Sequence, residues 1–406
     1  MRVLILSAST GGGHMRASSA LKTYIMNNDK DAVVEIIDTF EYINPILNKT
    51  VTEGYLYLAT KTPKMYGTVY NTSNKENAFK SLVFGLNSLF SRKLMPLLKE
   101  FKPDVIISTH PFSTEMVSNI KGKGEIKTPL ICIMTDYAPH RTWINKNVDS
   151  YVVANDGMID IMEKMGVNRD IIHPYGIPID ETFYTAKDRD IILKELGLNP
   201  EVPTILIMAG SFGVTDILKI YDSIVEIESE FQLIVITGRN KKLYEAFEKE
   251  IAKRTGTYER KYPIAIVEKV DEKLNKVIST IKKEHQPMAY KETKLLFFTN
   301  EVDKYMQTAD LIITKPGGLT VSEALACNLP MAIFNAIPGQ EEENAEFLID
   351  NNMAVRISKD STCKDTIRNL LENREELNMM KASCESFDKS ASAKNIYDLI
   401  KSLINK

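Results

Sequence analysis

The stretch that decides the fold is Leu311-Ile312-Ile313-Thr314-Lys315-Pro316-Gly317-Gly318-Leu319-Thr320-Val321-Ser322-Glu323-Ala324. An apolar run ends at Thr314, a Pro-Gly-Gly turn follows, and a helix is predicted over Thr320–Ala326. An apolar strand that passes through a glycine turn into a helix is typical of a parallel sheet covered by helices, where ligands bind at the carboxyl ends of the strands. The stretch therefore predicts an α/β fold with a ligand site at this turn.

The same turn is suited to an anion. Glycines let a ligand come close to the backbone, and the first N–H groups of the helix, with its dipole, favour a phosphate. Glu323 lies one turn into the helix and can accept both hydroxyls of a ribose. The alternative is an ordinary strand–helix turn with an exposed Glu, and the Walker pattern GxxxxGK[ST] is absent from this turn. The candidate phosphate and ribose residues are Lys315, Pro316, Gly317, Gly318, Leu319, Thr320 and Glu323.

Short apolar strands alternate with helical stretches along the rest of the chain, as in parallel sheets buried on both faces. The pattern starts twice: one strand leads to Gly11-Gly12-Gly13-His14, and another leads to Gly210-Ser211-Phe212-Gly213. We therefore expect two Rossmann-like halves with parallel sheets facing across a cleft. The predicted strands are Arg2–Ser7, Val33–Asp38, Asp104–Ser108, Leu130–Thr135, Ser150–Ala154, Thr204–Ala209, Gln232–Thr237, Leu295–Phe298, Leu311–Thr314 and Met331–Phe334.

Turn signals over Tyr175–Lys187 indicate a linker between the halves. We expect an N-terminal domain over residues 1–185, a C-terminal domain over 186–385, and a last helix over 386–406 that packs back on the first domain. The lysine- and glutamate-rich stretch 253–294 interrupts the strand–helix rhythm and is predicted to be an exposed helical insertion.

A second motif, Ile337-Pro338-Gly339-Gln340-Glu341-Glu342-Glu343-Asn344, follows the next strand and should face the same edge of the sheet. The side chains of Gln340 and Glu341 are suited to reading sugar hydroxyls, and Gly339 and Asn344 complete the candidate set. The alternative is a solvated helix start, where negative charge is favoured in any case.

A third motif, Gly11-Gly12-Gly13-His14, offers a base. Its glycines let the chain pass close to a ligand, and a histidine can remove a proton from an attacking hydroxyl near neutral pH. The alternative is a histidine that caps or packs. Gly12 and Gly13 are candidate binding residues and His14 is a candidate catalytic residue.

A fourth motif runs from Met134 to Trp143 and follows another strand of the first half. In it, Asp136 can orient His14 or act as the base itself, and the alternative is an Asp that caps a helix or turn. His110 also ends a strand and can line the cleft. His173 and His285 are interpreted as structural or exposed.

Composition excludes several classes of function. The net charge of −3 gives no global excess for nucleic acid, and the four cysteines form no CxxC pair. No His/Asp/Glu cluster has metal-ligand spacing, so neither a metal nor a cofactor is expected. No apolar run reaches the ~20 residues of a membrane helix, so we expect a cytoplasmic protein. Residues 75–99 form an amphipathic helix pattern with flanking lysines, which suits either its own core or an anionic membrane surface.

Taken in order along the chain, these motifs resemble one family. With Gly238 and Arg239 added, they are similar to the processive diacylglycerol glucosyltransferases and monogalactosyldiacylglycerol synthases, which share the GT-B fold with the peptidoglycan transferase acting on lipid-linked muropeptide. The likeness runs from Val3 to about Leu348. The stretch 253–294, which is longer than expected for the family, is the one clear departure from its pattern.

The resemblance implies a hexosyltransferase that uses UDP-glucose or UDP-galactose and acts on diacylglycerol or a glycosylated lipid, peripheral on the inner face of the cell membrane. It implies uracil and ribose near Phe298, Val302 and Glu323, diphosphate near Gly210, Ser211, Gly213 and residues 317–320, and hexose near Gln340 and Glu341. Lys315 or Arg239 would hold the charge of the UDP. Transfer to a polyprenol-linked acceptor, epimerisation of a UDP-sugar, and UDP-sugar sensing without turnover remain alternatives, and the oligomeric state is open.

Overall fold

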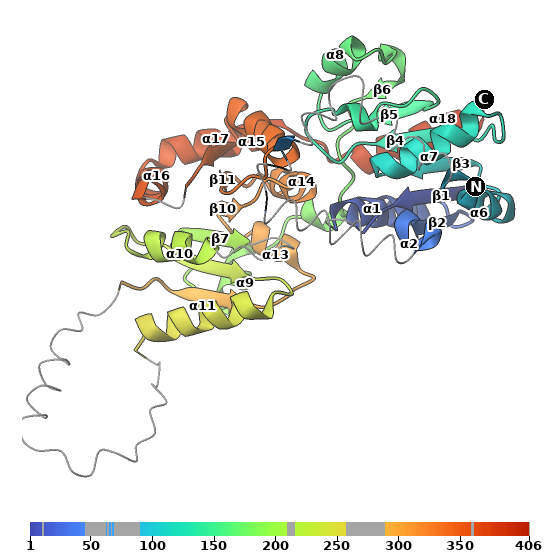
Figure 1. The fold of residues 1–406 in the computed structure, drawn as a ribbon. Coiled ribbons are helices and arrows are strands. Elements are labelled where there is room, and N and C mark those ends of the chain that lie inside the picture. The colour runs from blue at the N-terminus through green and yellow to red at the C-terminus, as the bar shows by residue number, and fades with distance from the viewer. Residues whose placement is uncertain are drawn as a thin grey trace, which may run out of the picture. The chain divides into compact units, whose positions relative to one another are not determined.

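The fold is taken from a computed structural model of the chain (Figure 1). It describes residues 1–9, 12–44, 62, 65, 67–68, 90–208, 216–256, 289–358 and 361–405. The predicted site residues Gly210, Ser211 and Gly213 lie outside these ranges, as do Gly11 and His285. Most of the amphipathic segment, residues 75–89, and most of the predicted insertion, residues 257–288, also lie outside them.

The first sheet has six parallel strands in the order β2-β1-β3-β4-β5-β6. Its central strands are fully buried because helices cover them, as continuous runs such as Val3–Leu6 require. Figure 1 shows α1 (Gly13–Asn28), α7 (Pro111–Gly122) and α18 (Ser392–Ile404) beside these strands. The strands are β1 Arg2–Ser7, β2 Val33–Asp38, β3 Val105–Ser108, β4 Leu130–Ile133, β5 Ser150–Val152 and β6 Ile172–His173.

The last helix belongs to the core of this sheet. Ile396 and Ile400 of α18 are fully buried in the same apolar cluster as Val3 and Ile5 of β1. Ser392 at the start of α18 donates its hydroxyl to the carbonyl of Gly176 at 2.9 Å.

The second sheet also has six strands, in the order β12-β11-β10-β7-β8-β9, and its recorded pairings are parallel. Each strand is again short, and the central strands β10, β7 and β8 are mostly apolar and buried. The strands are β7 Thr204–Met208, β8 Gln232–Ile236, β9 Thr293–Leu296, β10 Leu311–Thr314, β11 Met331–Ile333 and β12 Ala354–Arg356.

The chain divides into two compact units. The first unit holds residues 1–187, 314–356 and 375–406, and the second holds 188–313 and 357–374. Besides the helices already named, the first unit contains α2 Thr39–Ile43, η1 Arg92–Leu94, α6 Met95–Phe101, η2 Arg141–Trp143, α8 Gly157–Lys164, η3 Arg169–Ile171, η4 Glu181–Phe183, α14 Gly318–Ala326, α15 Gln340–Asp350 and nearly all of α17 Arg374–Ser386.

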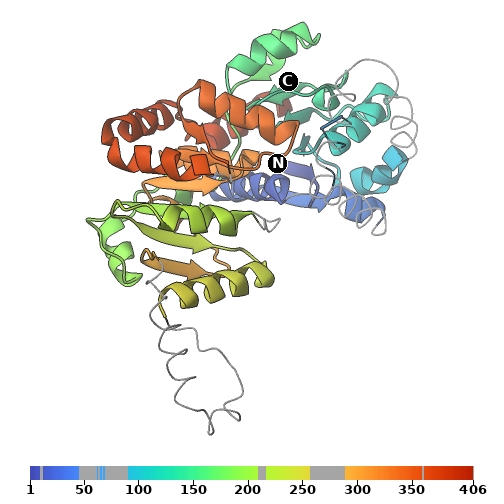
Figure 2. The ribbon, with the colours of Figure 1, turned by 60° about the vertical axis from the view of Figure 1, so that its left-hand side comes forward.

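The second unit contains α9 Arg189–Glu195, α10 Ile217–Val225, α11 Lys241–Arg254, α13 Val302–Met306 and α16 Ser361–Glu372. Figure 2 shows α10 and α11 beside strands β7, β8 and β9, and the rings of Tyr221 and Phe247 from these two helices meet edge to face at 5.3 Å. Arg254, at the end of α11, is almost fully buried and pairs with Asp222, Glu226 and Glu250.

The predicted α/β class with two parallel sheets is confirmed, and all ten predicted strands are present with ends within two residues of the prediction. The edge strands β6 and β12 were missed because they have only two and three residues. In the described part of segment 75–99, Leu94, Leu97 and Leu98 are buried within the first unit, so these side chains pack on the protein's own core.

Candidate functional site

The glycine turn lies at the end of β10 and opens α14 directly. The helix begins at Gly318, two residues earlier than predicted, because Gly317 in an extended conformation (φ −68°, ψ 134°) already serves as its N-cap. No side chain among the described residues caps this start, so the first N–H groups have no partner within the helix. The turn is braced from α15, because Asn344 donates its Nδ2 to the carbonyl of Pro316 at 2.9 Å.

The Gly12–His14 loop opens α1 in a similar way. Gly12 has a φ of +78°, which favours glycine, and no side chain of the described residues caps α1. A Cβ placed on Gly13 would meet the Cβ of Leu319 at 3.5 Å, and a Cβ on Gly318 would collide with the carbonyl oxygen of Thr135. Three predicted motifs, at residues 12–14, 134–136 and 317–319, therefore meet within the first unit.

His14 is half-buried and faces other ring side chains. Its ring lies 4.8 Å from that of His110, edge to face, and 6.3 Å from that of Trp143. Burial lowers the pKa of His14 to about 4, although a hydrogen bond with the backbone of Thr109 acts in the opposite direction. His14 is therefore neutral at pH 7, which a general base requires.

The partner of His14 differs from the expected one. Nδ1 of His14 lies 2.8 Å from the hydroxyl of Thr135, so this hydroxyl, and not the carboxylate of Asp136, holds the ring. Asp136 accepts instead from Nε1 of Trp143 at 3.2 Å and from Nε2 of Gln340. Burial raises the pKa of Asp136 to about 6, and the bonds from Gln340 and Trp143 limit the rise.

The residues of the second motif serve the site in ways that the sequence did not predict. Gln340, expected at a hexose, holds Asp136. Glu341, also expected at a hexose, accepts from the backbone N–H of Ile337 at 2.8 Å and lies 3.6 Å from Nζ of Lys315. Its carboxylate therefore organises its own turn. Gly339 adopts a φ of +100° before α15, which explains the glycine there.

Asn344 joins two of the predicted motifs. It is fully buried, accepts from the backbone N–H of Tyr137 at 2.8 Å and donates to Pro316. Both ends of its amide are thus satisfied by backbone groups of two segments, at Tyr137 and Pro316, that are far apart in sequence. It acts here as a brace.

Glu323 is buried, which excludes the alternative of an exposed Glu. Its side chain is only 2% exposed and forms an ion pair with Arg16, on the first turn of α1. The ion pair ties the helix that carries His14 to the helix that begins at Gly318. Arg16 was not singled out from the sequence, because the pattern around it gives no signal beyond helix.

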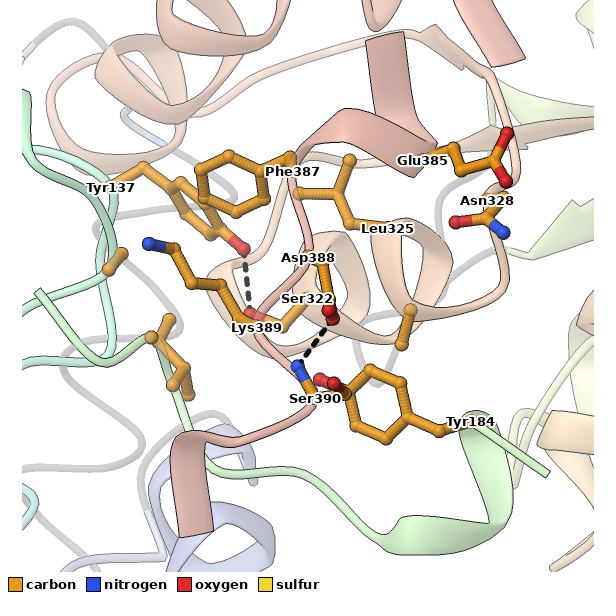
Figure 3. A pocket seen from close by; sticks show the side chains of 14 residues that line it. Tyr137, Tyr184, Ser322, Leu325, Asn328, Glu385, Phe387, Asp388, Lys389 and Ser390 are labelled. Carbon is orange, nitrogen blue, oxygen red and sulfur yellow. Dashed lines mark hydrogen bonds between the residues drawn. The ribbon is translucent and has the colours of Figure 1, made fainter. Parts of the chain in front are cut away.

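Tyr137 continues this network into a cavity of about 300 Å³, shown in Figure 3. Its hydroxyl lies 2.8 Å from that of Ser322, the neighbour of Glu323 in the chain. At the other side of the cavity, Asp388 accepts from the backbone N–H of Ser390 at 2.8 Å. The cavity is thus lined by Tyr137 and Ser322, the chain neighbours of Asp136 and Glu323.

Four of the predicted binding residues lie in the second unit: Phe298 and Val302, expected near the uracil, and Gly238 and Arg239. Gly238 has a φ of +64°, and the guanidinium of the next residue, Arg239, lies 4.6 Å from the ring centroid of Phe298. Phe298 is 46% exposed, and the half-buried Val302 begins α13. An exposed aromatic ring with a stacked guanidinium is suited to a flat base.

No group of three or more His, Cys, Asp or Glu side chains in the described ranges is placed to hold a metal ion. No helix in this part of the chain is both long enough and apolar enough to cross a bilayer.

Solved structures share this architecture. Acinetobacter baumannii MurG matches with a TM-score of 0.60 at 15% identity, over 99% of each chain. The Anabaena protein HepE in complex with UDP matches with a TM-score of 0.54 at 15% identity, over 99% of this chain and 100% of that one. The fold is that of the GT-B glycosyltransferases.

Sequence comparison gives the family. The family model for monogalactosyldiacylglycerol synthase matches residues 14–179, and the model for the glycosyltransferase family 28 C-terminal domain matches 264–403. The processive diacylglycerol beta-glucosyltransferase of Staphylococcus haemolyticus is 30% identical over 93% of this chain and 87% of its own length. That of Bacillus pumilus is 27% identical over 98% and 94%. The chain belongs to the family of processive diacylglycerol beta-glucosyltransferases.

Proposed function

We propose that this protein transfers glucose from UDP-glucose to diacylglycerol, and then to the glycolipid so formed. The proposal is carried by one observation: within one unit, the loop that presents His14 adjoins the uncapped start of α14. A base beside a phosphate seat is the arrangement that a nucleotide-sugar transferase needs. Family membership supports the same reaction.

The donor phosphates would bind at residues 317–320, where backbone N–H groups and the helix dipole favour an anion. Lys315 lies beside this turn, and its Nζ forms an ion pair with the carboxylate of Glu341 at 3.6 Å. The ribose hydroxyls would bind the carboxylate of Glu323 and replace the guanidinium of Arg16, which pairs with it here. Phe298 and Val302 would bind the uracil, and Arg239, which follows Gly238, would hold part of the charge of the UDP. Gly210, Ser211 and Gly213 would complete the diphosphate site.

In the reaction, the acceptor hydroxyl oxygen attacks the anomeric carbon of the hexose while His14 takes the hydroxyl proton. The bond from the anomeric carbon to the phosphate oxygen breaks, and UDP leaves with the bonding electron pair. Attack from the opposite face converts the α-linked donor into a β-linked product, the outcome in the relatives' names. Backbone amides aimed at the departing phosphate can supply about 3 kcal/mol each of transition-state stabilisation.

We also propose that residues 1–185 form the acceptor domain, that residues 186–385 form the donor domain, and that residues 386–406 form a terminal helix. The acceptor is a lipid, so the protein would work from the cytoplasm on the inner face of the membrane. The side chains of Leu94, Leu97 and Leu98 are already buried in the protein and would not contribute to membrane contact.

The experiment that tests the function is a donor panel. Purified protein is incubated with diacylglycerol and labelled UDP-glucose, UDP-galactose or UDP-N-acetylglucosamine, and the lipid products are separated and their linkage determined. We expect β-linked mono- and diglucosyl lipid from UDP-glucose. Lipid product from UDP-galactose alone would correct the donor, and UDP-sugar converted without any lipid would replace the proposal by an epimerase.

A further inference from the structure

We propose that Arg16 binds the diphosphate of the donor: its guanidinium, which pairs with Glu323 in this structure, moves to the phosphates when the ribose hydroxyls take its place on that carboxylate. The inference rests on the proposed function in placing the ribose at Glu323 and the phosphates at residues 317–320. It extends that proposal by naming a cation that the phosphates meet.

The ion pair lies beside the proposed phosphate site. Helical side chains lean toward the N-terminus of their helix, so the carboxylate of Glu323 covers the turn before it, next to residues 318–320. The Arg16 guanidinium that pairs with this carboxylate therefore lies close to the first turn of α14. A Cβ on Gly13 would come within 3.5 Å of the Cβ of Leu319, so α1 and α14 also approach each other at their starts. A rotation of the Arg16 side chain can then carry its guanidinium from the carboxylate to a phosphate.

The two partners differ in how freely they can change contacts. The side chain of Glu323 is 2% exposed, whereas that of Arg16 is 51% exposed. A buried carboxylate is costly without a partner, so Glu323 needs either the guanidinium or hydrogen-bond donors such as the two ribose hydroxyls. A half-exposed arginine loses little when it changes partner, because it stays charged and hydrated. The exchange therefore leaves the carboxylate with donors before and after the ribose binds.

The nearby basic groups Lys315 and His14 are less available. Nζ of Lys315 lies 3.6 Å from the carboxylate of Glu341, and Lys315 is only 9% exposed. His14 is neutral at pH 7, because burial lowers its pKa to about 4. A diphosphate at residues 317–320 would also lie near the charge of Glu323, and a cation between the two anions would reduce their repulsion. A guanidinium suits this place, since it can hold two phosphate oxygens at once.

The test measures the dissociation constants of uridine and UDP by isothermal titration calorimetry. Uridine has the ribose without the phosphates, so the two ligands separate the two positions of the guanidinium. The variants are Arg16→Met, which removes the charge and keeps a long side chain, Glu323→Gln, and the two changes combined. Arg169→Met is the matched control, because the Arg169 side chain is 54% exposed and also pairs with carboxylates, those of Asp160 and Glu163.

We expect the two ligands to respond to Arg16→Met with opposite signs. Uridine should bind about threefold tighter or more, because its ribose no longer competes with the guanidinium for Glu323. UDP should bind about threefold weaker or more, because its phosphates lose a charged partner. Added to Glu323→Gln, the Arg16→Met change should again weaken UDP and leave uridine within about twofold. Arg169→Met should match the wild type within about twofold for both ligands.

Opposite signs cannot come from misfolding, since a loss of folded protein weakens the apparent binding of both ligands together. If both ligands bind tighter in Arg16→Met, the residue only competes with the donor, and if both weaken equally, it only braces the two helices. Either result, or unchanged affinities, would overturn the inference. If the signs are opposite but the wild type makes no glycolipid, the proposed function fails while the assignment of Arg16 stands.

Discussion

Replacing Gly318 with Ala probes the contact on which the site depends. The added Cβ would collide with the carbonyl oxygen of Thr135, with the carbonyl carbon of Thr135 3.0 Å away and the Cα of Asp136 3.7 Å away. All three atoms are backbone, so no side chain can rotate to make room. Either α14 or the 135–136 segment must move.

The expected cost follows from this rigidity. Overpacking by one methyl group costs about 1–3 kcal/mol, and rigid backbone on both sides favours the upper end of that range. At roughly 2 °C per kcal/mol for a unit of this size, the unfolding midpoint should fall by about 2–6 °C. Because the shift separates His14 from the start of α14, kcat should fall by at least about tenfold.

Gly317→Ala is the matched control one residue away. A Cβ there meets nothing within 4 Å, and a φ of −68° is ordinary for alanine. The gain from a less flexible unfolded chain roughly offsets the poorer N-cap, so its free energy of unfolding should stay within about 1 kcal/mol of the wild type. Differential scanning calorimetry of both variants and the wild type measures the unfolding midpoints to be compared. A Gly318→Ala protein that melts within 1 °C of the wild type, or a Gly317→Ala protein that is equally destabilised, would refute the reasoning.

Three further predictions concern charge. Between about pH 4 and 6.5, folded His14 binds fewer protons than unfolded His14, so this residue makes the free energy of unfolding rise with pH. Between about pH 3.8 and 6, folded Asp136 binds more protons than unfolded Asp136, so this residue makes the free energy of unfolding fall with pH. The change in the free energy of unfolding between pH 4.5 and 6, measured by urea unfolding, should therefore be more negative in His14→Gln and more positive in Asp136→Asn than in the wild type. A change equal to that of the wild type in both variants would contradict both pKa values. Arg254→Ala should lower the free energy of unfolding by about 2 kcal/mol or more, because a buried cation leaves three carboxylates, while Arg169→Ala, whose ion pairs are exposed, should change it by less than about 1 kcal/mol. The initial rate of glucose transfer in the presence of EDTA should agree within about twofold with the rate in the presence of Mg²⁺, since helix N-termini and basic side chains would stabilise the phosphate charge. Loss of activity in EDTA would show that the reaction needs a metal ion.

The fold was predictable because most of its strands are continuous apolar runs that repeat with helices between them. Residues such as Val3–Leu6 and Ile205–Ile207 are fully buried, as their composition requires. The short strands β6 and β12 gave no such signal, since two or three residues show no periodicity. The start of α14 was predicted two residues too late, because the Pro-Gly-Gly sequence is typical of a turn, whereas Gly317 serves as the N-cap and Gly318 is already helical.

The site was predictable as a set of motifs but not as a network. Glycine loops at strand ends show in the sequence, and so does a histidine next to one. Which polar group meets which was not visible, because the pairs are far apart in sequence: His14 with Thr135, Arg16 with Glu323, and Asp136 with Gln340. The Met134–Asp136 stretch contains the residue that bonds His14, but its pattern favours Asp136 over Thr135, since a carboxylate is the usual partner of a catalytic imidazole.

The central claim is that His14 removes the acceptor proton while UDP leaves from the start of α14. It is tested most directly by single-turnover transfer from UDP-glucose to diacylglycerol with the wild type and His14→Ala, together with UDP affinity for both. We predict transfer at least about 100-fold slower in His14→Ala, with UDP affinity unchanged within about twofold. Transfer at the wild-type rate in His14→Ala would contradict the claim.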